Sequence, residues 1–187
     1  MLALKKAPAT VLVAACWLTV RLAAAQTNVP PVSITENGTV IIDGAATVPP
    51  YTGNGRWTEM KGKSSARYVT RHWNFMGPSG PPAMELYVAH DLTKEPPNGG
   101  FELGMVGGYL SAFSSGAGLQ HTEVWDDVVI GAARVKRCRA EMSKGERRLW
   151  LYAYVFVRQP SLTFVTIRPR PDAAPEIESY LRTVSLR

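Results

Sequence analysis

The run from Leu149 to Val157 constrains the fold more than any other part of the chain. Its sequence, LWLYAYVFV, alternates aliphatic with aromatic side chains, so both faces of an extended strand formed by it are apolar. A strand with one face in water alternates apolar with polar residues instead. The run therefore predicts an inner strand of a sheet that is covered on both faces.

The segments around this run extend the sheet. A turn at Ser143–Glu146 joins it to the preceding segment, and Gln159-Pro160 breaks the chain after it, so an antiparallel hairpin with a returning third strand is expected. Stretches rich in β-branched and aromatic residues predict further strands upstream. The other predicted strands are Arg67–Phe75, Ala83–His90, Leu119–Trp125, Ala132–Met142 and Ser161–Arg168.

Two segments have helical rather than strand periodicity. Phe101–Phe113 places apolar residues at helical spacing, and its glycines Gly104, Gly107 and Gly108 suggest a close approach of helix to sheet. Ala173–Val184 carries an amphipathic stripe, with Asp172 as its expected N-cap. The predicted fold is α+β: a mostly antiparallel sheet covered by helices on both faces, an α/β/α sandwich in a single domain.

Residues 1–25 have the layout of a secretory signal peptide. Lys5 and Lys6 precede an apolar stretch, and Ala23–Ala25 forms a small-residue cleavage site. The apolar stretch is shorter than the about 20 residues of a membrane-spanning helix, so no transmembrane anchor is expected. The alternative is a lipoprotein, since Val13–Cys16 resembles a lipobox with Cys16 as the lipidated residue.

This leader sets the expected domain organisation and location. Residues 26–65 are rich in Pro, Gly and Thr and are predicted to form an extended N-terminal segment, and residues 66–187 the globular α+β domain. The protein is expected to be exported, either periplasmic or secreted. Removing the leader lowers the net charge from +6 to +3, because the leader carries three cations and no acid, so a nucleic-acid partner is not expected.

Removal of the leader also leaves a single cysteine, Cys138. An intramolecular disulfide is then impossible. Cys138 shares a predicted strand face with Ala140 and Met142, which indicates a buried thiol with a raised pKa and little reactivity. No motif of nucleophilic catalysis and no cofactor-binding motif occurs, so no catalytic residue and no cofactor are predicted.

The predicted hairpin concentrates positive charge between residues 134 and 148. This density predicts an anion-binding surface for lipid head groups, an acidic polysaccharide or an acidic partner protein. The alternative is an edge strand kept soluble by its charges. The cations are Arg134, Lys136, Arg137, Arg139, Lys144, Arg147 and Arg148.

The densest cluster of metal-ligating residue types is His121, Glu123 and Asp126. On a strand, His121 and Glu123 point to one face and can touch one ion. A further ligand for zinc is offered only by His90 or Asp91. The alternative interpretation is a solvated strand end that runs into a turn.

The second half of the chain resembles the PsbP-like superfamily in its layout: a helix, strands that end in a long hairpin, a returning strand and a short C-terminal helix. The resemblance covers about the last 85 residues and is carried by Gly131–Val135, Leu149–Phe156 and Leu162–Ser185. It implies an exported, generally non-catalytic domain that acts through binding or assembly. The Pro/Gly-rich first third does not map onto this pattern, and no functional residues carry over.

The sequence as a whole therefore predicts an exported, non-enzymatic binding or assembly domain of the cell envelope, its partner an unidentified envelope protein or anionic surface. One alternative is a small metal-assisted hydrolase that uses His121, Glu123 and Asp126. Another is an anionic-surface binder that acts through the basic hairpin.

Overall fold

The computed structural model describes residues 29–187 except 53, 78–82 and 94. The expected leader, together with Cys16, lies outside the described residues. Neither helix in the described part of the chain is long and apolar enough to cross a membrane.

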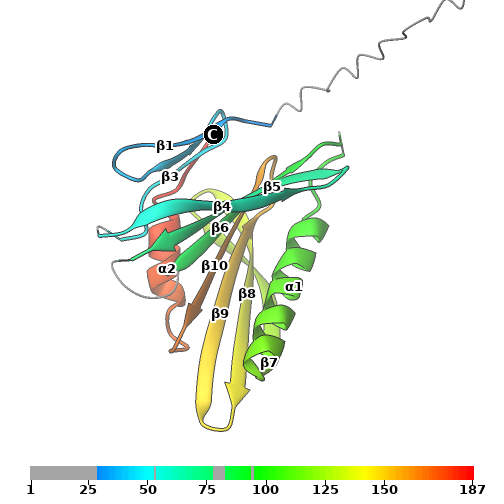
Figure 1. Ribbon diagram of the computed structural model, residues 1–187, viewed down its shortest axis with the longest axis vertical. Helices are drawn as coiled ribbons and strands as arrows, with labels where there is room; N and C mark the ends of the chain where they lie inside the picture. Colours follow the sequence, from blue (N-terminus) through cyan, green and yellow to red (C-terminus); the bar gives the residue numbers. More distant parts are fainter. Residues whose placement is uncertain (1–28, 53, 78–82, 94) are drawn as a thin grey trace, which may run out of the picture.

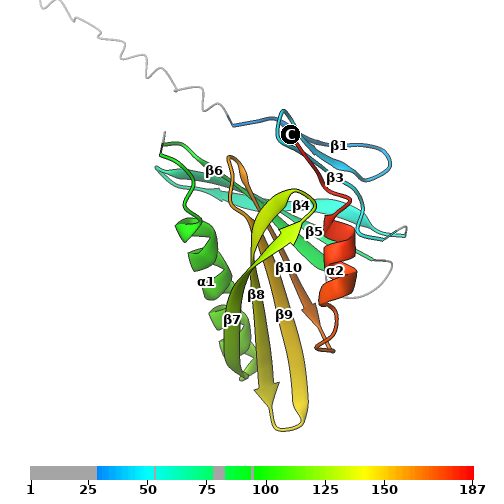
Figure 2. The same ribbon diagram turned by 180° about the vertical axis from the view of Figure 1, so that it is seen from behind.

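The core of the fold is a seven-stranded antiparallel sheet with the order β4-β5-β6-β10-β9-β8-β7 (Figure 1). Its long outer strands twist strongly relative to one another (Figure 2). The strands are β4 (Arg56–Ser64), β5 (Tyr68–Met76), β6 (Met84–Asp91), β7 (Gln120–Ile130), β8 (Ala133–Lys144), β9 (Arg147–Phe156) and β10 (Ser161–Arg168).

A smaller four-stranded sheet and two helices complete the described chain. The small sheet has the order β1-β2-β3-β11, so the last strand pairs with the first third of the sequence. The elements are β1 (Val32–Ile34), β2 (Val40–Ile42), β3 (Ala46–Val48), α1 (Gly100–Ala117), α2 (Ala174–Leu181) and β11 (Ser185–Leu186).

Strand β9 has the inner position that its sequence predicts. It lies between β8 and β10, and every side chain from Leu151 to Phe156 is buried. Leu151, Ala153 and Val155 pack in a core with Val106 and Leu110 of α1. The alternate residues of β9 form a second core, on the opposite face, with α2 and the small sheet. The prediction of a strand buried on both faces is confirmed.

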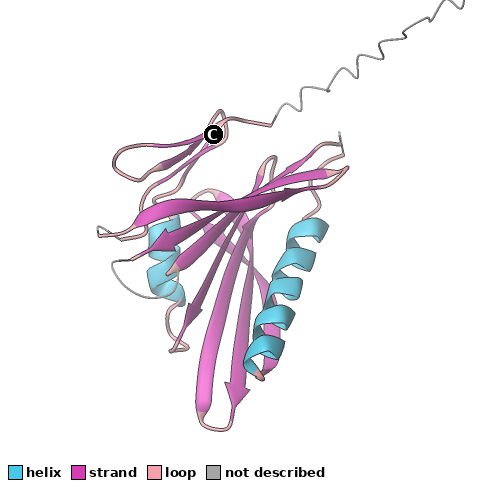
Figure 3. Ribbon diagram, viewed as in Figure 1, coloured by secondary structure: helices cyan, strands magenta, loops and turns pink. Residues whose placement is uncertain are grey.

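The predicted α/β/α sandwich is wrong. Strands account for 51% of the described residues and helices for 17%, and the strands form two sheets (Figure 3). One covering layer is largely the small sheet, with buried Val40, Ile42 and Val48, joined by the short helix α2. The segment 26–65, expected to be extended, contributes β1–β3 and β4. These strands pair with their neighbours in sequence, and β3 also pairs with β11 at the other end of the described chain.

Two local expectations for the helices are also wrong. A Cβ atom added at Gly104, Gly107 or Gly108 meets nothing within 4 Å, so these glycines do not bring α1 closer to the sheet. The helix instead contacts the sheet through larger buried residues on its opposite side. Asp172 does not cap α2, which follows Ala173 and has no side-chain hydrogen bond at its N-terminus.

The open space around these glycines predicts that alanine in their place stabilises the protein. Replacing Gly104 and Gly108 together with alanine should raise the free energy of unfolding by about 1–2 kcal/mol, because each glycine costs about 1 kcal/mol in a helix interior. Urea denaturation of the double variant measures this. In contrast, Gly99→Ala should destabilise, because Gly99 has φ of 78° and a Cβ there lies 3.0 Å from Val157. A double variant less stable than the wild type would contradict the prediction.

Candidate functional site

A candidate site in the described residues is a pocket of about 500 Å³ between the first half of α1 and strands β4, β5 and β6. This volume is in the range of small-molecule sites. Its walls are largely apolar. The lining residues are Lys61, Gly62, Lys63, Ser64, Ser65, Tyr68, Thr70, His72, Tyr87, Phe101 and Met105.

Strand alternation explains why these side chains share one face. On β5, Trp73 and Phe75 are buried in the core on the α2 side. Their alternate neighbours Thr70 and His72 therefore face α1. The same alternation on β6 directs Tyr87 towards α1, where it packs against the core of that helix.

A β-bulge shapes the rim of the pocket. The pairing of β4 with β5 shifts register between Met60 and Lys63, which places Lys63 opposite Thr70. A bulge re-aims the side chains that follow it, so Lys63 lies on the pocket face of the sheet. Gly62 is required at the bulge, because a Cβ there lies 2.3 Å from the main-chain oxygen of Thr70.

The polar floor of the pocket consists of His72 and Tyr87, and Glu85 holds both side chains in place. Its carboxylate accepts hydrogen bonds from the hydroxyls of Tyr87 and Tyr109, both at 2.6 Å, and from His72 Nε2 at 3.0 Å. Tyr109 belongs to α1, so the carboxylate links this helix to β5 and β6. The His72 ring also stacks on Tyr87, with ring centres 4.2 Å apart.

The electrostatics of this network keep Glu85 ionised. Burial raises the pKa of Glu85, but hydrogen bonds from His72, Tyr109 and Tyr87 outweigh it, so the pKa is lowered. Burial and the neighbouring Glu85 carboxylate raise the pKa of both Tyr87 and Tyr109. The tyrosines therefore remain protonated donors, and the carboxylate remains their acceptor.

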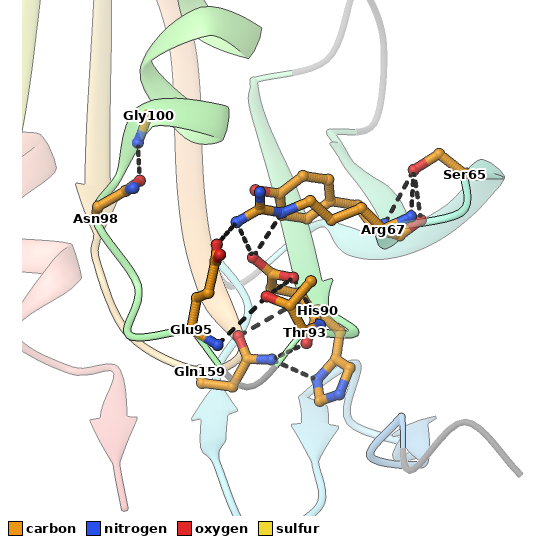
Figure 4. A network of polar contacts seen from close by, with 10 residues as sticks. Ser65, Arg67, His90, Thr93, Glu95, Asn98, Gly100 and Gln159 are labelled. Carbon is orange, nitrogen blue, oxygen red and sulfur yellow. Dashed lines mark hydrogen bonds and ion pairs between the residues drawn. The ribbon is translucent and has the colours of Figure 1, made fainter. Parts of the chain in front are cut away.

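A second polar network braces the mouth of the pocket. Tyr68 stacks on Phe101 of α1, with ring centres 3.9 Å apart, and the Arg67 guanidinium lies 5.2 Å from the Tyr68 ring centre. Arg67 is held by ion pairs to Asp91, at 3.0 Å, and to Glu95, at 2.7 Å (Figure 4).

The loop after β6 and Gln159 fix Asp91, one of the two acids of this network. The main-chain and side-chain groups of Thr93 donate to Asp91, and the Gln159 amide donates to the main-chain oxygen of Asp91 (Figure 4). Burial raises the pKa of Asp91, but hydrogen bonds from Thr93 and Arg67 outweigh it and lower the pKa to about 2. The aromatic pair at the pocket mouth therefore rests on a fixed support.

The structure does not gather the predicted hairpin cations into one patch. Arg137 and Arg139 lie on the α2 side, where both approach Asp126. Lys136 is paired with Asp127 at 3.2 Å on the other face. The alternative of a charged edge strand is wrong, because β8 lies between β7 and β9.

The remaining hairpin cations are divided between the two ends of β8. Arg148 is 3.4 Å from Glu141 near the β8–β9 turn. Within the described residues, Arg134, Lys144 and Arg147 form no ion pair. The hairpin therefore carries much less unpaired charge than its sequence suggests.

The three predicted metal ligands are not brought together either. His121 Nδ1 lies 2.9 Å from Ser114 Oγ on α1, whereas Asp126 is on the opposite face, bound to Arg137. Within the described residues, no group of three His, Cys, Asp or Glu side chains is arranged to hold a metal ion.

Cys138 lies where the sequence places it. The side chain is completely buried in the core beneath α1, in one cluster with Ala140 and Met142. Burial, with a contribution from Glu123 and Asp126, raises the pKa of the thiol to about 12. The expectation of a buried thiol with a raised pKa is confirmed, and its low reactivity stays a prediction.

Sequence reasoning missed the pocket and the network around Glu85. A signal was present in β6, where Glu85 interrupts an otherwise mostly apolar strand. An acid on a covered strand face requires hydrogen-bond donors, which directs attention to tyrosines and histidines on neighbouring elements.

No family model, curated protein or solved structure matches this chain. The layout resemblance to the PsbP-like superfamily stays a prediction, and the function has to be inferred from the geometry of the molecule.

Proposed function

We propose that the chain is a non-enzymatic binding domain whose site is the pocket between α1 and β4–β6. Its ligand is a small amphipathic anion with an apolar body. The observation that carries the proposal is an apolar pocket of about 500 Å³ with two lysines at its rim. The signal peptide expected at residues 1–25 extends the proposal to an exported domain of the cell envelope.

The lining residues predict a ligand with two parts, an apolar body and an anionic head. Phe101 and Met105 of α1, with Tyr68 of β5, offer an apolar and aromatic surface for its body. Lys61 and Lys63 come from the bulge at one side of this surface and supply ammonium groups for its anionic head. A carboxylate or sulfonate joined to an aliphatic or aromatic body has this chemistry.

The floor of the pocket supports binding rather than catalysis. A tyrosine hydroxyl must ionise to act as a nucleophile, and the raised pKa values of Tyr87 and Tyr109 keep their hydroxyls protonated. Within the described residues, His72 has Glu85 as its hydrogen-bond partner, and the other donors to Glu85 are the tyrosine hydroxyls. This arrangement holds the pocket rigid and preorganised for a ligand.

Filling the pocket tests the proposal. The fluorescent probe 8-anilinonaphthalene-1-sulfonate is an amphipathic anion, and its titration on the folded protein should show saturable binding. Met105→Trp should weaken this binding at least about tenfold, because the larger side chain occupies the space of the ligand body. Competition by decanoate but not by decanol would show that the anionic head is recognised.

The matched control is Val124→Trp on β7. Val124 is 57% exposed and does not line the pocket, so this variant adds the same indole at a distant surface. Its affinity for the probe should equal that of the wild type. Equal weakening in both variants, or a wild type that does not bind the probe, would refute the proposed site.

A further inference from the structure

A second concave site, at the end of the large sheet, is cationic. It is a depression of about 520 Å³ where β9 ends, β8 begins and β11 of the small sheet passes. Three arginines and no acidic residue line it. The lining residues are Ala133, Arg134, Phe156, Val157, Arg158, Gln159, Leu186 and Arg187.

Three separate segments bring these arginines together. Arg134 is the second residue of β8, Arg158 follows β9 closely, and Arg187 follows β11. The Arg187 main-chain N–H donates to the oxygen of Ala45 at 2.9 Å, which continues the small sheet. The Arg158 guanidinium donates to the main-chain oxygen of Arg187, so the ends of β9 and β11 are joined at the site.

Two of the three arginine side chains at this site have no anionic partner in the described part of the chain. Within the described residues, the guanidinium groups of Arg134 and Arg187 form no ion pair, whereas that of Arg158 donates to the oxygen of Arg187, the last residue of the sequence. The buried ring of Phe156 and the half-buried Leu186 form an apolar wall beside them. Unpaired cations in a concavity with a low-dielectric wall concentrate positive potential.

We propose that the side chains of Arg134 and Arg187, with Arg158 beside them, form a binding site for a phosphate group. The planar guanidinium presents paired N–H donors that match two oxygens of a phosphate, so several arginines around one depression suit this ligand. Only one of the seven hairpin cations takes part. The site is therefore a discrete one, and its phosphate belongs either to a soluble phosphate compound or to a phospholipid head group.

Two binding assays on the full chain test the proposal and separate the two sources. Inorganic pyrophosphate, measured by isothermal titration calorimetry, represents the soluble source. Phosphatidylglycerol in phosphatidylcholine vesicles, measured by co-sedimentation, represents the lipid source. Arg134→Gln should weaken binding in at least one assay by about tenfold, the effect of losing one charged hydrogen-bonding pair.

The matched control is Arg147→Gln. Arg147 is also exposed and forms no ion pair in the described residues, but it lies at the β8–β9 turn, the other end of β8. Arg147→Gln removes the same charge as Arg134→Gln, but the affinities of this control variant for pyrophosphate and for the vesicles should stay within twofold of the wild type. Arg134→Gln leaves every hydrogen bond of the described residues intact, and an unchanged urea midpoint confirms its folding.

The outcomes are distinct. If Arg134→Gln loses pyrophosphate binding but keeps vesicle binding, the ligand is a soluble phosphate compound. If it loses vesicle binding but keeps pyrophosphate binding, the ligand is a lipid head group. Equal weakening by Arg147→Gln would show a general effect of net charge and overturn the site. Binding that ignores Arg134 in both assays, or no binding by the wild type, would also overturn it.

Discussion

Replacing Arg137 with methionine is expected to lower the free energy of unfolding by about 3 kcal/mol, the scale of breaking a largely buried ion pair. Arg137 is 15% exposed and donates to two acids, at 2.9 Å to Asp126 and at 2.7 Å to Glu178. Methionine retains much of the volume but leaves Glu178 without its cation and Asp126 with only the longer contact to Arg139, at 3.6 Å. Glu178 is itself only 18% exposed, so water compensates little.

The effect is large because the network joins four elements. Asp126 belongs to β7, Arg137 to β8 and Glu178 to α2, and the hydroxyl of Tyr154 on β9 donates to Glu178 at 3.2 Å. These contacts attach α2 to the large sheet beside the core. Loss of Arg137 therefore weakens the docking of the helix as well as the pairing of the outer strands.

The loss in Arg137→Met should depend on pH. The hydrogen bond from Arg137 lowers the pKa of Asp126 in the folded state. An acid whose folded pKa is lowered stabilises the protein above its unfolded value of about 4, and this contribution disappears as pH falls through the folded pKa. Urea denaturation should therefore show a larger difference from the wild type at pH 7 than at pH 3.

The matched control for this variant is Arg147→Met, which removes the same charge from an exposed site without an ion pair in the described residues. Its stability should stay within about 0.5 kcal/mol of the wild type, as for most surface substitutions. An Arg137 variant as stable as this control at pH 7 would show that the network does not hold α2.

Local patterns in the sequence predicted the main strands and helices. The strand from Leu149 is identified by the apolar character of both its faces, and α2 by an amphipathic stripe whose Ile177 and Leu181 are buried. The small sheet was not predicted as such, because three-residue strands are too short for an alternating pattern. Its last pairing, of Leu186 with Ala46, joins opposite ends of the described chain.

The same distinction between local and distant information explains what was missed at the surface. The basic hairpin looks highly charged when its residues are counted along the chain. In the structure, the register of β7 with β8 places Asp126 opposite Arg137 and Asp127 opposite Lys136. Whether a charge is free depends on strand register, which no local pattern of this sequence fixes.

The pocket depends on distant pairing in a similar way. His72 comes beside Tyr87 through the pairing of β5 with β6, and Tyr109 reaches Glu85 only because α1 crosses this part of the sheet. The three residues around Glu85 thus come from three elements. A lone acid in a strand indicated that partners are needed, but the fold determines which residues they are.

Replacing Glu85 with leucine is expected to destabilise the protein by about 3 kcal/mol and to impair the pocket. Leucine is similar in size but accepts no hydrogen bond, so the hydroxyls of Tyr87 and Tyr109 lose their acceptor in a half-buried site. Each unsatisfied donor costs about 1 kcal/mol or more. Tyr109→Phe, which removes one of these bonds and no charge, should cost about 1 kcal/mol.

The pH dependence and the ligand affinity separate this role of Glu85 from a general loss of charge. The folded pKa of Glu85 is lowered, so its contribution is present above the unfolded value of about 4.3 and is lost as pH falls through the folded pKa. The stabilities of Glu85→Leu and the wild type should therefore converge towards pH 3, as measured by urea denaturation.

Probe affinity at pH 7 should fall about tenfold, because the rings that form the floor lose their anchor. Glu146→Leu, which removes an exposed acid at the β8–β9 turn, should change neither property. If Glu85→Leu retained wild-type stability and affinity at pH 7, the carboxylate would not be what fixes α1 and the pocket floor in place.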